Sequence, residues 1–240
     1  MLLESTFEDA SGFSHWVKEV CRPEAITLSD AVSRKGRYSA RFEFTKTDPL
    51  LYNGFVRAEI KQGFPMDHTG EAWYGFSHYL ENWICDPRAE VVAQWHEIPD
   101  WDLGENWRSP PVSLEIKDNR YTVKVLWASQ PVNTNKTKDG ERFYDLGPVR
   151  SDVWVDWVFH IKFRYDETGV LEVWKNKKKL LTRKGPNAYN DKNWPYFKLG
   201  IYKWSWAGGG KSSPESQRVL FLDEVRVGNR FSSLRMVSPK

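Results

Sequence analysis

The chain has 240 residues, and its 35 Lys and Arg against 32 Asp and Glu give a formal net charge of only +3. This balance excludes the strongly basic character typical of nucleic-acid-binding proteins, although it permits an anionic partner. The sequence also has no apolar run of about 18 residues, which argues against a membrane-spanning helix.

Strand-like segments follow one another along the chain, and helical periodicity is nearly absent. The alternating or apolar segments lie at 37–44, 55–61, 72–80, 90–98, 112–127, 154–181, 195–203 and 218–228. Turn residues at Asp118-Asn119, from Asp166 to Gly169, and at Asn176-Lys177 divide the longer segments into hairpins. The pattern predicts a single all-β domain over residues 1–240, folded as a two-sheet antiparallel jelly-roll sandwich. No internal repeat is visible, which excludes a propeller.

Three of these segments carry polar side chains on one face, because residues two or four apart on a strand point the same way. The pairs are Arg57 and Glu59, Gln94 and His96, and Lys198 and Tyr202. Taken singly, each pair has an ordinary explanation: a surface ion pair, a solvated imidazole, or a strand-forming Tyr. If the three faces line one groove, they place an amide, an imidazole, a guanidinium, an ammonium and a phenol together.

The segments "RAEI", "QWHEI" and "YFKLGIYKW" resemble the three signature strands of the jelly-roll polysaccharide lyases. Alginate lyases of this type have Arg-x-Glu, Gln-x-His and Tyr-Phe-Lys-x-Gly-x-Tyr strands in the same order. The heparin lyase I and glucuronan lyase families share the fold and the Lys-x-Gly-x-Tyr spacing. The resemblance runs from about residue 37 to residue 228. It implies a concanavalin A-like sandwich that cleaves a uronic acid polymer by β-elimination.

The chain departs from the alginate lyase pattern at several positions. Trp95 stands where those enzymes have Ile, "YKW" replaces "YNQ", and the Arg strand lacks their second Arg. These differences weaken alginate as the substrate more than they weaken the lyase assignment. We therefore expect glucuronan first, heparin or heparan sulfate second, and alginate third.

β-Elimination removes the C5 proton of a uronate and expels the sugar linked at O4, so it needs a neutralised carboxylate, a base and an acid. We expect Arg57, Gln94 and His96 to bind the carboxylate. Tyr202 can act as base or acid if a nearby cation lowers its pKa from about 10, and Lys198 is the expected cation. Whether Tyr202 or His96 is the base is left open.

The loop 99–111 is long for a compact domain, and its Trp101 and Trp107 either stack on sugar rings or pin the loop in place. The aromatic content of 15% fits a sugar-binding surface and an aromatic core equally well. We expect five residues to contact the substrate. They are Glu59, Tyr196, Trp101, Trp107 and Lys203.

No His and Cys cluster has the spacing of a zinc site, and we expect catalysis to need no cofactor. Related sandwich domains often hold a structural Ca²⁺ where the first and last strands meet. The resemblance implies that Glu8, Gly36 and Asp223 supply the ligands of such an ion, since oxygen donors suit Ca²⁺.

Cys21 and Cys85 allow one disulfide or two free thiols. The segment "MLLESTFEDA" lacks a signal peptide's basic start and apolar core, so the chain is either a mature secreted domain or a cytoplasmic protein. We expect a secreted or periplasmic monomer whose partner is an anionic polysaccharide, with no nucleic acid or membrane partner. Two alternatives remain on the same fold: a glycoside hydrolase, which needs paired carboxylates, and a non-catalytic carbohydrate-binding module.

Overall fold

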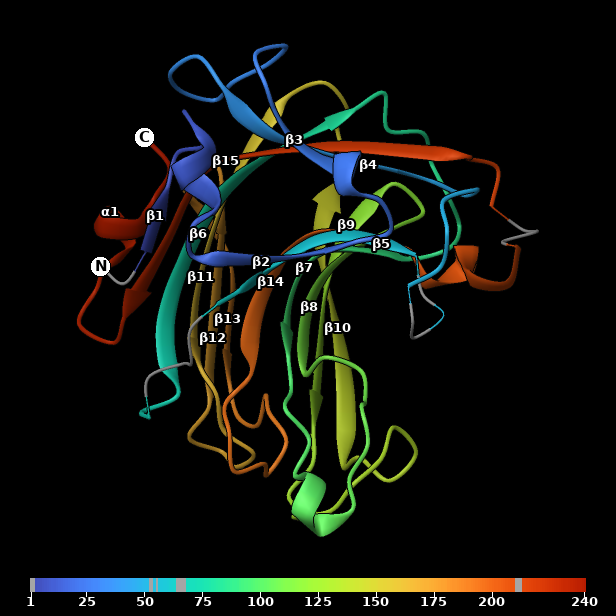
Figure 1. The fold of residues 1–240 in the computed structure, drawn as a ribbon. Helices are drawn as coiled ribbons and strands as arrows, with labels where there is room; N and C mark the ends of the chain where they lie inside the picture. The colour runs from blue at the N-terminus through green and yellow to red at the C-terminus, as the bar shows by residue number, and fades with distance from the viewer. Residues whose placement is uncertain (1–2, 52–53, 55, 64–67, 210–212) are drawn as a thin grey trace.

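The computed structural model describes residues 3–51, 54, 56–63, 68–209 and 213–240. Its strands form two antiparallel sheets packed against each other (Figure 1). This arrangement confirms the predicted all-β sandwich. Among the described residues, no helix is both long and apolar enough to cross a membrane.

In the part of the chain that the structure describes, one sheet has eight strands and the other has seven. In spatial order the eight-stranded sheet contains β13 (Lys178–Lys184), β12 (Val170–Lys175), β11 (Trp154–Lys162), β6 (Glu71–Glu81), β15 (Gln217–Asn229), β4 (Ser39–Thr45) and β3 (Ile26–Ser29), with β1 (Leu3–Ser5) paired to β15. The seven-stranded sheet contains β10 (Gly140–Pro148), β9 (Arg120–Trp127), β8 (Val112–Lys117), β7 (Glu90–His96), β14 (Tyr196–Tyr202), β5 (Arg57–Gln62) and β2 (Trp16–Val20).

The helical elements are short and connect or cover the strands. They are η1 (Ala10–Phe13), η2 (Pro23–Ala25), η3 (Trp101–Leu103), η4 (Trp204–Gly209) and α1 (Leu234–Val237). Phe55, the first residue of the strand predicted at 55–61, lies outside the described residues. The described part of that strand begins at Arg57.

Aromatic side chains from both sheets fill the space between them. Trp95 of β7 packs against Phe197 of β14, with ring centroids 5.0 Å apart, and against Phe159 of β11 at 4.8 Å. Trp157 and Tyr74 extend this cluster from the eight-stranded sheet, and all five side chains are fully buried. Much of the Trp content therefore builds the core, where burial of each large ring contributes a few kcal/mol.

Two predicted hairpin turns are confirmed. Asp118 and Asn119, between β8 and β9, have φ values of 50° and 56°, and Asn176 and Lys177, between β12 and β13, have 48° and 68°. Two successive positive φ values are typical of the type I′ turn, whose twist matches that of the strands it joins. The turns therefore set the register of both hairpins.

Candidate active site

β7, β14 and β5 lie side by side in the seven-stranded sheet, and they bring the three predicted motifs together. Strict alternation on β14 sends Phe197, Leu199 and Ile201 into the core. The intervening residues of β14 therefore point to the opposite face, which we call the site face. Lys198 pairs in register with Gln94 of β7, and Tyr202 pairs with Arg57 of β5.

Gly200 allows β14 and β5 to approach at the centre of this face. Its φ of +132° lies in a region that L side chains rarely adopt. A Cβ at this position would also lie 2.2 Å from the backbone oxygen of Ala58 on β5. The glycine of the Lys-x-Gly-x-Tyr pattern is thus required by the backbone, because the β5 backbone already occupies the position of a Cβ.

Glu59 is the centre of a buried network of charges on the site face. Its Oε2 lies 2.7 Å from Lys198 Nζ and 3.3 Å from Arg57 Nη1, and its Oε1 accepts a 2.5 Å hydrogen bond from Gln94 Nε2. Glu59, Gln94 and Lys198 are each only 1% exposed, whereas Arg57 is 8% exposed. Glu59 therefore fixes the positions of Lys198, Arg57 and Gln94 from the buried side of the network. Of these three donors, Arg57 is the most exposed.

Glu19 is a member of the network that the sequence did not reveal. It comes from β2, at the edge of the sheet, and its Oε2 lies 2.6 Å from Lys198 Nζ and 3.2 Å from Arg57 Nη1. Lys61 of β5 binds its other oxygen at 3.1 Å. Although burial raises the pKa of Glu19, Lys198, Lys61 and Arg57 together hold it at about 2. Three cations thus face two carboxylates, which leaves one positive charge on this part of the site face.

Tyr202 lies at one end of the network, beneath Arg57. The guanidinium carbon is 4.3 Å from the centre of the phenol ring, a cation–π contact. Burial raises the pKa of Tyr202 to about 12, against the opposing effect of Arg57. The expectation that Lys198 lowers this pKa is wrong, because Lys198 is paired with Glu19 and Glu59 and the cation at the phenol is Arg57. Tyr202 is therefore protonated at neutral pH in the free protein.

His96 lies on the same face but at the other end. It pairs with Tyr196, six residues before Tyr202 on β14, which corresponds to about 20 Å between the Cα atoms of Tyr196 and Tyr202. Its ring stacks on Tyr196 with centroids 5.8 Å apart, and its Nδ1 lies 2.7 Å from Glu97 Oε2. His96 and Tyr202 therefore do not meet over a single sugar ring, and His96 belongs to a second group of residues.

The two loop tryptophans belong to this second group. Trp107 contacts the His96 ring edge-on at 5.3 Å, and Trp101 contacts Trp107 at the same distance. Trp101 is 54% exposed and Trp107 is 56% exposed. The loop itself is held by Arg108, whose buried guanidinium pairs with Glu105 at 2.6 Å and with Asp191 at 2.7 Å. Since Arg108 anchors the loop, both Trp rings remain available to stack on sugars.

Lys203 does not contact the site face, and its prediction as a substrate ligand is wrong. Its side chain is 0% exposed, and its ammonium lies 2.9 Å from Asp86 and 3.4 Å from Glu90. Glu90 also accepts hydrogen bonds from two guanidinium nitrogens of Arg218 on β15. Lys203 has the same parity as Phe197, Leu199 and Ile201, so the alternation of β14 places it on the buried side, where it anchors the segment after Tyr202.

Trp95 does not contact the site face, so the expectation that this residue weakens alginate as the substrate is wrong. It is fully buried in the core, so its size reflects packing against Phe197 and Phe159. Cys21 and Cys85 are not joined by a disulfide. Cys21 Sγ accepts a hydrogen bond from the Arg57 backbone N–H at 3.3 Å, which helps to hold the start of β5.

The predicted calcium ligands surround one loop without forming a metal site. Glu8 accepts hydrogen bonds from the backbone N–H groups of Arg37 and Tyr38, close to Gly36. Asp223 accepts them from Arg34, Lys35 and Glu224. Within the described residues, no group of three or more His, Cys, Asp or Glu side chains could hold a metal ion. The carboxylates at these positions therefore bind backbone donors, and we assign no role to calcium.

Comparison with models of protein families matches the polysaccharide lyases over residues 5–226. The chain belongs to the polysaccharide lyase family. It is therefore an enzyme, and the site face described above is the part of this lyase that carries the residues of the three motifs. No curated protein is matched by the sequence.

Solved structures of lyases share the fold. The endo-beta-1,4-glucuronan lyase of the fungus Trichoderma reesei is 23% identical with a TM-score of 0.73, and the match covers 90% of each chain. An alginate lyase of polysaccharide lyase family 7 is 13% identical with a TM-score of 0.62, over 91% of this chain and 96% of the other. A cellulose-induced protein is 11% identical with a TM-score of 0.58, over 94% and 96%. At these identities the likeness concerns the sandwich fold.

Proposed function

We propose that this lyase cleaves an unsulfated polyuronate, with glucuronan as the first candidate, and that Tyr202 transfers the proton. The observation that carries the proposal is the position of the Tyr202 phenol. It lies under Arg57, at the end of a network with one surplus positive charge. That surplus matches the single carboxylate of a uronate unit.

The positive charge addresses the difficult part of the reaction. The C5 hydrogen of a uronate is weakly acidic because its removal places a second negative charge next to the carboxylate. A preorganised cation lowers this barrier by stabilising the charge as it develops. Arg57 is the proposed donor to the carboxylate, while Glu59, Gln94 and Lys198 fix the position of Arg57. The electrons of the C5–H bond then form the C4–C5 double bond, and the bond from C4 to O4 breaks.

Tyr202 is proposed as both base and acid. In a glucuronate unit the C5 hydrogen and O4 lie on the same side of the ring, so one phenol can reach both. Tyr202 first gives its phenolic proton to solvent. The phenolate then takes the C5 proton and passes it to the departing O4, which regenerates the phenolate. Arg57, 4.3 Å from the ring centre, stabilises the phenolate. His96 of β7 lies opposite Tyr196, too far from Tyr202 to act on the same unit, and we assign it to the binding of a more distant sugar.

The charge of the site face favours an unsulfated polymer. Arg57, Lys61 and Lys198 face Glu19 and Glu59, so the network leaves one positive charge, which matches one bound carboxylate. Heparin carries several sulfates for each disaccharide, and it would require a larger excess of cations. Glucuronan and alginate each carry one carboxylate per unit. The structural likeness to a glucuronan lyase supports glucuronan ahead of alginate.

The paired carboxylates argue against glycoside hydrolysis, and the buried network argues against a simple binding module. Glu19 and Glu59 are both bound to Lys198 and Arg57, so neither is placed as a free general acid.

A polymeric substrate is too large to enter a cell, so we further propose that the enzyme works as a secreted or periplasmic monomer. Its partner is the anionic polysaccharide.

A panel of polymers tests the proposal. Purified protein is incubated separately with glucuronan, heparin and alginate, and the ultraviolet absorbance of the unsaturated uronate product is followed. Because hydrolysis forms no double bond, absorbance rises only if β-elimination occurs. We expect the largest kcat/KM for glucuronan. Faster cleavage of heparin would contradict the charge argument, and faster cleavage of alginate would leave the mechanism intact but refute the substrate.

A further inference from the structure

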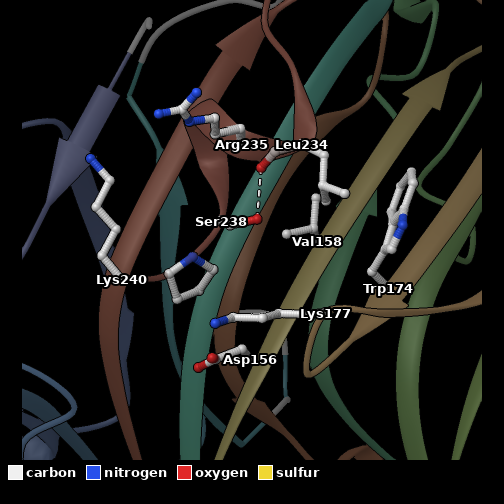
Figure 2. Close-up of a pocket in the computed structure, with 9 residues that line it drawn as sticks. Asp156, Val158, Trp174, Lys177, Leu234, Arg235, Ser238 and Lys240 are labelled. Carbon is white, nitrogen blue, oxygen red and sulfur yellow. Dashed lines mark hydrogen bonds between the residues drawn. The ribbon is translucent and has the colours of Figure 1, made fainter.

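The outer face of the eight-stranded sheet carries a hollow that is separate from the site face. Its lining comes from β11, from the end of β12 and the turn that follows, and from residues 234–240 (Figure 2). Tyr202 and Arg57 belong to the other sheet, on the far side of the core. A ligand in this hollow would therefore not contact the groups proposed to transfer the proton.

The hollow has an apolar wall. Val158, Trp174 and Leu234 line it, and they pack with Trp73 and Val237 in a cluster separate from the main core. Figure 2 shows Val158 and Trp174 on one side of the hollow and Lys240 on the other. The cavity measures about 440 Å³, which lies within the range of ligand-binding sites.

The rim of the hollow is positively charged. Lys177, Arg235 and Lys240 are exposed, and within the described residues no acidic side chain lies within 4.0 Å of their side-chain nitrogens. The Glu224 carboxylate accepts a 3.0 Å hydrogen bond from the backbone N–H of Lys240. The lining carboxylate, Asp156, is already neutralised, because Arg34 donates hydrogen bonds of 3.0 and 2.9 Å to its two oxygens. Lys177 lies in the turn before β13, whereas Arg235 and Lys240 lie in the segment 234–240. The three cations are therefore not explained by the lysine-rich edge strand β13 alone.

A second hollow continues the first. It measures about 410 Å³, shares Asp156 and Lys177 with the first, and adds Arg34, Asn176 and Trp154. We call the two hollows together the outer trough. It runs between Trp174 at one end and Trp154 at the other, with cations along its length. An elongated ligand with an apolar ring face and repeated negative charges fits this arrangement.

We propose that the outer trough binds a second stretch of the anionic polysaccharide, away from the site of cleavage. The identity of the polymer rests on the proposed function, whereas the trough and its charge do not. Pyranose C–H faces pack against Trp174 and Leu234, and carboxylates pair with Lys177, Arg235 and Lys240. A chain held there raises the local concentration of polymer at the other sheet, so long substrates gain affinity that short ones do not.

The binding test uses the full chain carrying Tyr202→Phe, so that the ligand is not consumed. Nuclear magnetic resonance follows the indole N–H signal of Trp174 during titration with glucuronate hexasaccharide. The neutral cellohexaose is the control ligand. We expect the signal to shift with the glucuronate ligand alone. An equal shift with cellohexaose, or no shift with either ligand, would overturn the proposal.

The kinetic test uses proteins that retain Tyr202. Lys177→Asn with Arg235→Gln removes two rim cations, and Asn tolerates the positive φ of position 177. Lys178→Asn with Arg230→Gln is the matched control, because it makes the same change in charge outside the trough. We expect the rim variant to raise the KM for long glucuronan about three- to tenfold, with kcat/KM for the hexasaccharide unchanged.

The two proposals fail in different ways. Unsaturated product from all variants with identical polymer KM values would refute the outer trough and leave the lyase mechanism standing. A Trp174 shift without any product from wild-type protein would refute glucuronan as substrate, while binding in the trough would stand.

Discussion

We expect the buried ion pair between Lys198 and Glu59 to contribute strongly to the free energy of unfolding. Both side chains are 1% exposed, and 2.7 Å separates their charged atoms. Lys198→Met leaves the Glu59 carboxylate buried with Arg57 at 3.3 Å and Gln94 at 2.5 Å as its remaining partners. Removing one partner of a buried pair costs about 3 to 5 kcal/mol, and since two partners remain we expect about 3 kcal/mol.

A double-mutant cycle with Glu59→Gln measures the pair itself. Lys198→Met with Glu59→Gln removes both charges, so it should be at least about 2 kcal/mol more stable than the sum of the single changes. Urea unfolding gives the free energies, provided that the m value is constant. The exposed pair of Arg120 and Asp145 is the control, and its cycle should give about 1 kcal/mol or less. Additivity within about 0.5 kcal/mol at Lys198 and Glu59 would refute the network.

Three further predictions concern Tyr202, His96 and Lys203. Because the pKa of Tyr202 is raised to about 12, the fraction of Tyr202 present as phenolate grows tenfold with each pH unit below that value. We therefore expect log kcat/KM to rise with a slope of about +1 above neutral pH. A flat profile would mean that Tyr202 acts only as the acid. His96→Ala should raise KM about three- to tenfold through lost stacking while kcat stays within about threefold, whereas a base at this position would make kcat collapse. Lys203→Met should lower the free energy of unfolding by about 3 kcal/mol, because Asp86 and Glu90 stay buried and Arg218 is the cation left beside them. A change below about 1 kcal/mol in urea unfolding would contradict this.

The sequence predicted the fold and the three site strands because their alternation is clean. On β14 every second residue enters the core, which assigns Lys198 and Tyr202 to the open face without further information. The type I′ turns at Asp118-Asn119 and Asn176-Lys177 were equally readable, since few residue pairs adopt two positive φ values.

The remaining features depend on long-range contacts. Glu19 belongs to β2, an edge strand whose Trp16, Val17 and Lys18 do not alternate cleanly, and only the fold brings it to Lys198. The separation of His96 from Tyr202 depends on the register between β7 and β14. Parity places both side chains on one face, but it does not give their distance along the sheet. The prediction for Lys203 is wrong because it disregards parity: Lys203 alternates with Tyr202 and falls on the buried side with Phe197, Leu199 and Ile201.

The central claim, that Tyr202 transfers the proton, is tested most directly by the kcat of Tyr202→Phe on glucuronan. The change keeps the ring under Arg57, so the protein should fold and KM should change little. Loss of a positioned acid–base group should lower kcat about 10² to 10⁴-fold. Tyr196→Phe, on the same face beside His96, is the matched control and should retain most of kcat. A folded Tyr202→Phe protein that keeps more than about a tenth of the wild-type kcat would contradict the mechanism.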